Sequence, residues 1–191
     1  MNLAERHFAL RGWVLAIALA LLLAARARLG ADEAPLRPAW LLLALAGILL
    51  RGQAGAYLGA HGNASKAQAP ALAAGGPYRF SRNPLYVSNL LVAAGLIFYA
   101  NAFSRPVAIA FLLALFLHHA LLVRHEEGVL AKRFGEAYDA YRRDVPRWIG
   151  FRHGKAKGTM RGASLRETGV RQARNVLYAL LATLSIWIAA R

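Results

Sequence analysis

The sequence predicts an all-α fold, a polytopic integral membrane bundle of about five transmembrane helices with an amphipathic helix at the membrane surface. Of the 191 residues, 58% are hydrophobic and only 17% are charged, whereas soluble domains carry about 25% charged residues. The apolar residues form long blocks, as membrane-spanning helices require. Polar stretches that contain Gly and Pro separate these blocks. The length fits a single membrane domain over residues 1–191.

The net charge of +15 restricts the partners that we expect. Lys and Arg concentrate beside the apolar blocks, where the anionic headgroups of membrane lipids are the natural counter-charge. Nucleic acid, a common partner of very basic soluble chains, is therefore not expected. The chain has no cysteine, which excludes disulfides, thiol catalysis and thiolate metal ligands.

The first apolar block covers residues 8–25. The apolar core of a signal peptide is only about 7–15 residues long, so we expect a retained transmembrane helix. A second span is expected over residues 39–58 and contains Arg51. This side chain either faces protein or water, or reaches the membrane interface, and the sequence leaves both interpretations open.

The middle of the chain predicts a helical hairpin. A non-helical stretch over residues 61–82 precedes a third span at 85–100. A tight turn at 101–106 then connects it to a fourth span at 107–123.

An amphipathic helix is expected after the fourth span. Apolar and aromatic side chains recur there at helical spacing opposite a charged face, which is typical of a helix at the membrane surface. The apolar face consists of Leu130, Phe134, Tyr138 and Tyr141. In the tail, residues 151–191, a basic connection leads to a capping-box pattern at Ser164 and Glu167 and to a last span at 170–190.

The distribution of Lys and Arg predicts the orientation. Most of them follow the second and fourth spans, and few lie on the opposite side. By the positive-inside rule, the N-terminus and these two segments face the cytosol. We expect an integral protein of a bacterial inner membrane.

The first candidate site is the polar stretch Gly75 to Tyr86. It contains a helix start, with Asn83 as N-cap and Pro84 as the first helical residue. It also combines two glycines, which allow a ligand close to the backbone, with Tyr78 and Tyr86, which offer rings and hydroxyls. A helix N-terminus favours anionic groups. From the residues alone, a helix start and a ligand site are equally good interpretations.

The second candidate site is the acidic pair at the end of the fourth span. Helical spacing puts Glu126 on the same face as His119 and Val123, which predicts a buried carboxylate with a ligand role. Glu127 lies three residues from Arg124, which predicts a solvated ion pair at the helix end.

Other kinds of site are not expected. His118 and His119 are adjacent and point to different faces of a helix, so no metal site is predicted. No nucleophile elbow and no glycine-rich dinucleotide motif occurs in the sequence.

Two separated motifs carry a family resemblance. The first is Gly76-Pro77-Tyr78-Arg79-Phe80-Ser81-Arg82-Asn83-Pro84-Leu85-Tyr86, and the second is Glu126-Glu127 with the segments 133–138 and 141–147. In this order, with a helical hairpin between them, they resemble the isoprenylcysteine carboxyl methyltransferase family, which includes bacterial proteins similar to phospholipid methyltransferases. The resemblance covers roughly residues 45–150, and the tail beyond Gly150 resembles the family poorly.

The resemblance implies that S-adenosylmethionine binds near the cytosolic face. The residues at the family's cofactor positions are Leu72, Ala73, Tyr78, Asn83, Pro84, Leu85, Tyr86 and Glu126. Arg124 lies near a position that some members use toward the substrate. Many members have His in place of Asn83, and Asn lacks a titratable ring. No metal is implied.

The implied reaction is methyl transfer to a lipophilic carboxylate, amine or thiol. Such an in-line displacement requires alignment and exclusion of water. An amine or thiol must first lose a proton, and His119 is the nearest candidate base; Arg124 and Glu126 complete the predicted catalytic set. The alternatives are a membrane reductase that uses a nicotinamide cofactor, and a non-enzymatic membrane scaffold.

Overall fold

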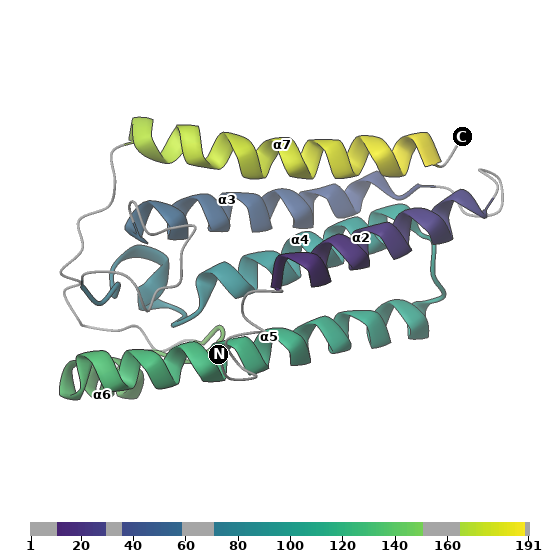
Figure 1. Ribbon diagram of the computed structural model, residues 1–191. Helices are drawn as coiled ribbons and strands as arrows, with labels where there is room; N and C mark the ends of the chain where they lie inside the picture. The colour runs from purple at the N-terminus through teal and green to yellow at the C-terminus, as the bar shows by residue number, and fades with distance from the viewer. Residues whose placement is uncertain (1–10, 30–35, 59–70, 151–164, 190–191) are drawn as a thin grey trace. The chain divides into compact units, whose positions relative to one another are not determined.

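The computed structural model describes residues 11–29, 36–58, 71–150 and 165–189, and every regular element among them is a helix (Figure 1). The α-helices are α2 (Arg11–Ala27), α3 (Leu41–Leu58), α4 (Pro84–Ala100), α5 (Arg105–Phe134), α6 (Glu136–Asp144) and α7 (Leu165–Ala189). Two short 3-10 helices are η1 (Pro38–Trp40) and η4 (Gly76–Arg79). For these residues the all-α prediction is confirmed.

Two of the helical segments in the described part of the chain are long and apolar enough to cross a membrane. They are Pro38–Leu58 and Arg105–Phe134, which contain the predicted second and fourth spans. The other three predicted spans fall on shorter apolar helices, Ile17–Ala27, Pro84–Ala100 and Leu177–Ala189. The capping residue Ser164 lies outside the described residues.

One predicted boundary is wrong. The fourth span and the amphipathic helix were expected to be separate, but α5 continues through residue 123 to Phe134. The break comes at Gly135, whose φ of 49° lies in the left-handed region that glycine adopts without steric cost. Its N–H donates to the carbonyl of Ala131 at 3.0 Å, which closes the last turn of α5. The predicted amphipathic helix is therefore divided between the end of α5 and α6.

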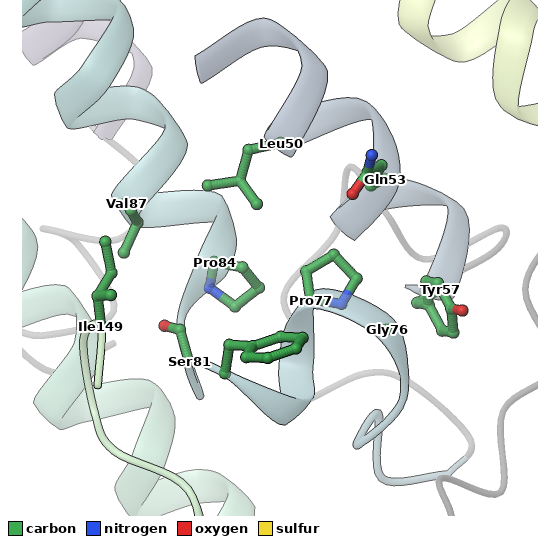
Figure 2. A pocket seen from close by; sticks show the side chains of 10 residues that line it. Leu50, Gln53, Tyr57, Gly76, Pro77, Ser81, Pro84, Val87 and Ile149 are labelled. Carbon is green, nitrogen blue, oxygen red and sulfur yellow. The ribbon is translucent and has the colours of Figure 1, made fainter. Parts of the chain in front are cut away.

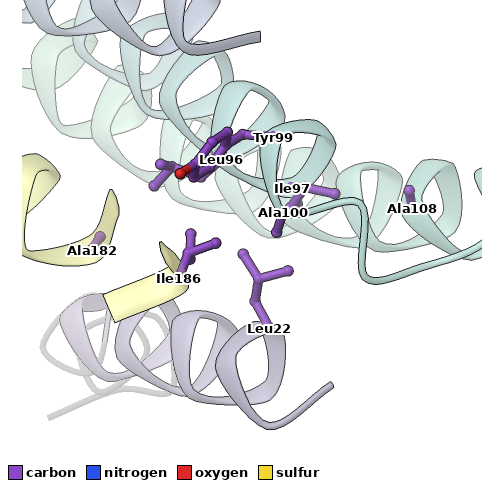
Figure 3. Packing of buried hydrophobic residues seen from close by; sticks show 8 residues of the cluster. All are labelled: Leu22, Leu96, Ile97, Tyr99, Ala100, Ala108, Ala182 and Ile186. Atoms are coloured by element: carbon purple, nitrogen blue, oxygen red, sulfur yellow. The ribbon is translucent and has the colours of Figure 1, made fainter. Parts of the chain in front are cut away.

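The contacts divide the chain into two compact units. Unit 1 consists of residues 1–46, 90–122 and 176–191, and unit 2 of residues 47–89 and 123–175. In unit 1, residues of α2 and α7 pack with residues of α4 and α5 (Figure 3). The buried cluster consists of Leu22, Leu96, Ile97, Tyr99, Ala100, Ala108, Ala182 and Ile186.

Unit 2 contains two smaller buried clusters, and the loop before α4 (residues 71–83) contributes to both. Ala73 and Tyr78 of this loop pack with Ala54 and Leu58 of α3. Ala74 packs with residues of α5, α6 and the following turn, which are Leu130, Tyr138, Tyr141 and Val145. The loop is therefore fixed by apolar contacts to helices that are far away in the sequence.

Candidate functional site

Tyr78 is the largest buried side chain of the loop before α4. Only 1% of it is exposed, and its hydroxyl has no hydrogen-bond partner within the described part of the chain. Burial raises its pKa well above the ordinary 10.0, and the nearby Tyr141 and Glu126 add to this effect. The hydroxyl is therefore a neutral, buried group that can still donate and accept hydrogen bonds.

Glu126 lies near enough to Tyr78 for its charge to raise the pKa of the tyrosine. It is on α5 and is 4% exposed, so the predicted burial of this carboxylate is confirmed. His119, which is 2% exposed, belongs to unit 1, whereas Glu126 belongs to unit 2. The role of His119 as a base stays a prediction.

The positive charge of Arg51 offsets part of the rise that burial causes in the pKa of Tyr78. Its Nη1 donates to Oδ1 of Asn89 at 2.7 Å. Of the two open interpretations for this arginine, the structure supports the one in which it contacts protein. Both residues lie in unit 2.

The start of α4 matches the sequence prediction. Pro84 is its first residue, and the N–H groups of Tyr86 and Val87 donate to the carbonyl of Asn83 at 3.1 and 3.2 Å. Tyr86 is buried and interacts electrostatically with Tyr78. The structure therefore brings Tyr78, Tyr86 and Glu126 together.

The other predicted cofactor residues lie close in the same unit. Ala73 and Leu85 pack in the cluster of Tyr78, and Leu72 packs in the cluster of Tyr141. Arg124 is exposed, and no contact described in the structure joins it to Tyr78. Its role toward a substrate stays a prediction.

Asn83 is fully buried, and its amide nitrogen is engaged within the protein. Nδ2 donates to Oε1 of Glu127 and to the backbone carbonyl of Arg147, each at 3.0 Å. Its predicted contact with the cofactor stays a prediction.

The prediction for Glu127 is wrong. It was expected to form a solvated pair with Arg124 at a helix end, but it is only 8% exposed. Its carboxylate lies 3.2 Å from Nε of Arg82 and 2.9 Å from Nη2 of Arg147. Because α5 continues for seven further residues, Glu127 is not at the helix end, and the segment after α6 covers it. The arginines beside Asn83 and Pro146 were the sequence signal for this missed network.

The two glycines before Tyr78 meet a protein side chain. Gly76 has a φ of 53°, and a Cβ added there would lie 2.2 Å from Cε2 of Tyr57. A Cβ on Gly75 would lie 3.0 Å from the same ring. The close backbone approach that the sequence indicated is thus an approach to Tyr57 of α3.

Unit 2 also holds a cavity of about 630 Å³, which is within the range of small-molecule sites. Figure 2 shows it between α3, the loop before α4 and the first turn of α4. Gln53, Tyr57 and Ser81 supply the polar groups of its lining. The rest of the lining consists of Leu50, Gly76, Pro77, Phe80, Pro84, Val87 and Ile149.

The profile of the family described as phospholipid methyltransferase matches residues 39–137, just over half of the chain. The chain belongs to the phospholipid methyltransferase family. With its two long apolar helices, it is a membrane methyltransferase. No curated protein and no solved structure matches the chain.

Every predicted site residue of the methyltransferase lies within the matched range, since these residues run from Leu72 to Glu126. Glu127 and Arg82 are also within it. Arg147 and the cavity residue Ile149 follow the matched range.

Proposed function

We propose that the protein transfers a methyl group from S-adenosylmethionine to a lipophilic acceptor at the cytosolic membrane face. The observation that carries this proposal is the polar group in unit 2 that consists of the buried Tyr78, Tyr86 and Glu126 and the half-buried Arg51. This group lies inside the range that the phospholipid methyltransferase profile matches.

The residues of this group fit the proposed cofactor. When bound, S-adenosylmethionine supplies a methyl group on a cationic sulfonium. The carboxyl group of Glu126 is buried on α5, and its acceptor oxygens suit the cationic groups of such a ligand. The Tyr78 hydroxyl, which has no hydrogen-bond partner among the described residues, can bond to a polar ligand atom. Leu72, Ala73, Pro84 and Leu85 offer apolar surface and backbone groups nearby.

The cavity of unit 2 supports a lipophilic acceptor. Most of its lining is apolar, and it neighbours the start of α4, where Pro84 and Tyr86 are buried. An apolar wall excludes water, which favours a reaction in which an anionic nucleophile meets a cationic methyl donor. A carboxylate, an amine or a thiol attached to an apolar body fits this chemistry.

The membrane topology belongs to the same proposal. Each of α2, α3, α4, α5 and α7 contains an apolar segment, and we propose that all five cross a bacterial inner membrane. The basic segments after α3 and α5 then face the cytosol.

An assay of methyl transfer tests the function. Purified protein in lipid bilayers is incubated with methyl-labelled S-adenosylmethionine and a bacterial lipid extract, and label in the organic phase is counted. We expect transfer by the wild type, a strong loss in Glu126→Gln, and full transfer in Glu136→Gln, whose carboxylate is exposed on α6. No transfer by the wild type to any lipid fraction, together with saturable binding of a reduced nicotinamide cofactor, would favour a reductase.

A further inference from the structure

We propose that Glu127 is a positioning residue that fastens the segment after α6 over the loop before α4 and so holds one wall of the apolar cavity. The segment, called the arm, consists of residues 145–150. Glu127 thereby controls the binding of the acceptor, whereas its neighbour Glu126 lies on the cofactor side. The acceptor part rests on the proposed function, and the fastening of the arm does not.

Glu127 joins three segments that are far apart in the sequence. Oε1 accepts a hydrogen bond from Nδ2 of Asn83 at 3.0 Å and lies 3.2 Å from Nε of Arg82. Oε2 accepts a hydrogen bond from Nε of Arg147 at 3.0 Å, and Nη2 of Arg147 lies 2.9 Å from it. One buried carboxylate of α5 therefore holds both the loop before α4 and the arm.

The backbone of the arm is also bonded to the loop. The N–H of Arg82 donates to the carbonyl of Pro146 at 2.9 Å, and Nδ2 of Asn83 donates to that of Arg147 at 3.0 Å. Beyond these bonds, the arm reaches Ile149, which lines the cavity although 71% of it is exposed. The position of this wall depends on bonds made two and three residues earlier.

The exposures of the two arginines indicate which side of the network opens. The side chain of Arg82 is 10% exposed and that of Arg147 is 45% exposed. Without the carboxylate, the two guanidinium groups would lose the counter-charge that they share. Arg147 can turn into water more easily than Arg82, so the arm moves and carries Ile149 away from the cavity.

Glu126 and Glu127 thus have separate tasks. The charge of Glu126 raises the pKa of Tyr78. Glu127 accepts a hydrogen bond from Asn83 and forms ion pairs with Arg82 and Arg147. Loss of Glu127 is expected to weaken binding of an apolar acceptor while leaving cofactor binding intact.

The absence of cysteine from the chain allows a direct test of the arm. A nitroxide label on Ile149→Cys reports the mobility of the arm, and a label on Ala137→Cys, on the exposed face of α6, is the control. We expect Glu127→Gln to make the label at 149 much more mobile and to leave the label at 137 unchanged. Glu136→Gln should change neither label. Equal mobility at 149 with and without Glu127 overturns the proposal, and so does a rise at both positions, which reports general unfolding.

Binding measurements on the same variants test the division of tasks. The probes are S-adenosylhomocysteine in a calorimetric titration and a photoreactive farnesyl thioether carboxylate, whose crosslinks to the cavity are counted by mass spectrometry. We expect Glu127→Gln to lower crosslinking by about tenfold, because a displaced wall no longer holds the acceptor in place, with unchanged affinity for S-adenosylhomocysteine. Arg147→Gln should give the same pattern, and the double variant should add little. Loss of S-adenosylhomocysteine binding in Glu127→Gln overturns the proposal, because Glu127 would then act on the cofactor. If the wild type binds no S-adenosylhomocysteine, the proposed function fails, and the label at 149 still decides the role of Glu127.

Discussion

The hydroxyl of Tyr141 donates a hydrogen bond of 2.7 Å to the backbone carbonyl of Tyr78, and both residues are buried. This bond connects α6 to η4 and fixes the loop that carries the proposed cofactor site. The neighbouring Tyr138 is equally buried, but its hydroxyl has no hydrogen-bond partner among the described residues. The two tyrosines of α6 therefore form a matched pair for mutation.

We predict that Tyr141→Phe lowers the free energy of unfolding by about 1–3 kcal/mol, because it leaves the buried carbonyl of Tyr78 without its donor. Tyr138→Phe should change it by less than about 0.5 kcal/mol, since no described hydrogen bond is lost. Denaturant unfolding in a mild detergent measures both values. An equal decrease in the free energy of unfolding of the two variants would show that the hydrogen bond to Tyr78 does not stabilise the fold.

Alkaline pH should destabilise the protein through its buried tyrosines. Burial raises the pKa of Tyr78, Tyr138 and Tyr141 above the ordinary value of 10.0. Below about pH 10 these groups are protonated in both states, and above it the unfolded chain loses protons that the folded chain keeps. The free energy of unfolding should therefore fall above pH 10, by up to about 1.4 kcal/mol per pH unit for each tyrosine. In Tyr138→Phe the free energy of unfolding should fall less steeply with pH. An unchanged slope would show that the buried Tyr138 does not contribute to the fall.

Gly76→Ala should be more damaging than Gly135→Ala. Both glycines have positive φ, of 53° and 49°, which strains an alanine at either position. At Gly76 the new Cβ would also overlap the ring of Tyr57, whereas nothing lies within 4 Å at Gly135. We expect Gly76→Ala to cost about 1–3 kcal/mol more, because the ring must move. Thermal unfolding compares the two variants. When Tyr57→Ala is added to both of them, most of the difference in their stability should disappear, because the ring that meets the new Cβ is gone.

Gly95 of α4 should tolerate alanine poorly, because a Cβ there would lie 2.5 Å from the backbone nitrogen of Ala44 in α3. In α5, Gly128 has nothing within 4 Å, and alanine should stabilise that helix by about 0.5–1 kcal/mol. We therefore predict opposite signs for Gly95→Ala and Gly128→Ala in thermal unfolding. An unchanged or raised unfolding temperature in Gly95→Ala would contradict the close packing of α3 and α4 at Gly95.

Local sequence signals predicted the helices and the two motifs. Pro84 starts α4 because its ring suits the first helical position, and periodicity placed Glu126 on a buried face. These features depend on neighbours within a few residues, which a sequence shows directly.

The partners of Glu127 could not be derived in this way. Spacing offered Arg124 as an i,i+3 partner, but Arg82 and Arg147 lie 45 and 20 residues away and reach Glu127 only through the fold. The same holds for Gly76, whose neighbour is Tyr57 of α3. The break at Gly135 had a local signal, a glycine between two helical patterns, which the apolar spacing of Leu130 to Tyr141 concealed.

We propose above that unit 2 binds S-adenosylmethionine through Glu126. Calorimetric titration of the detergent-purified protein with S-adenosylhomocysteine tests it most directly, with Glu126→Gln and the exposed-site control Glu136→Gln measured beside the wild type. We expect saturable binding by the wild type and by Glu136→Gln, and none by Glu126→Gln. Absence of binding by the wild type, or unchanged binding by Glu126→Gln, would contradict it.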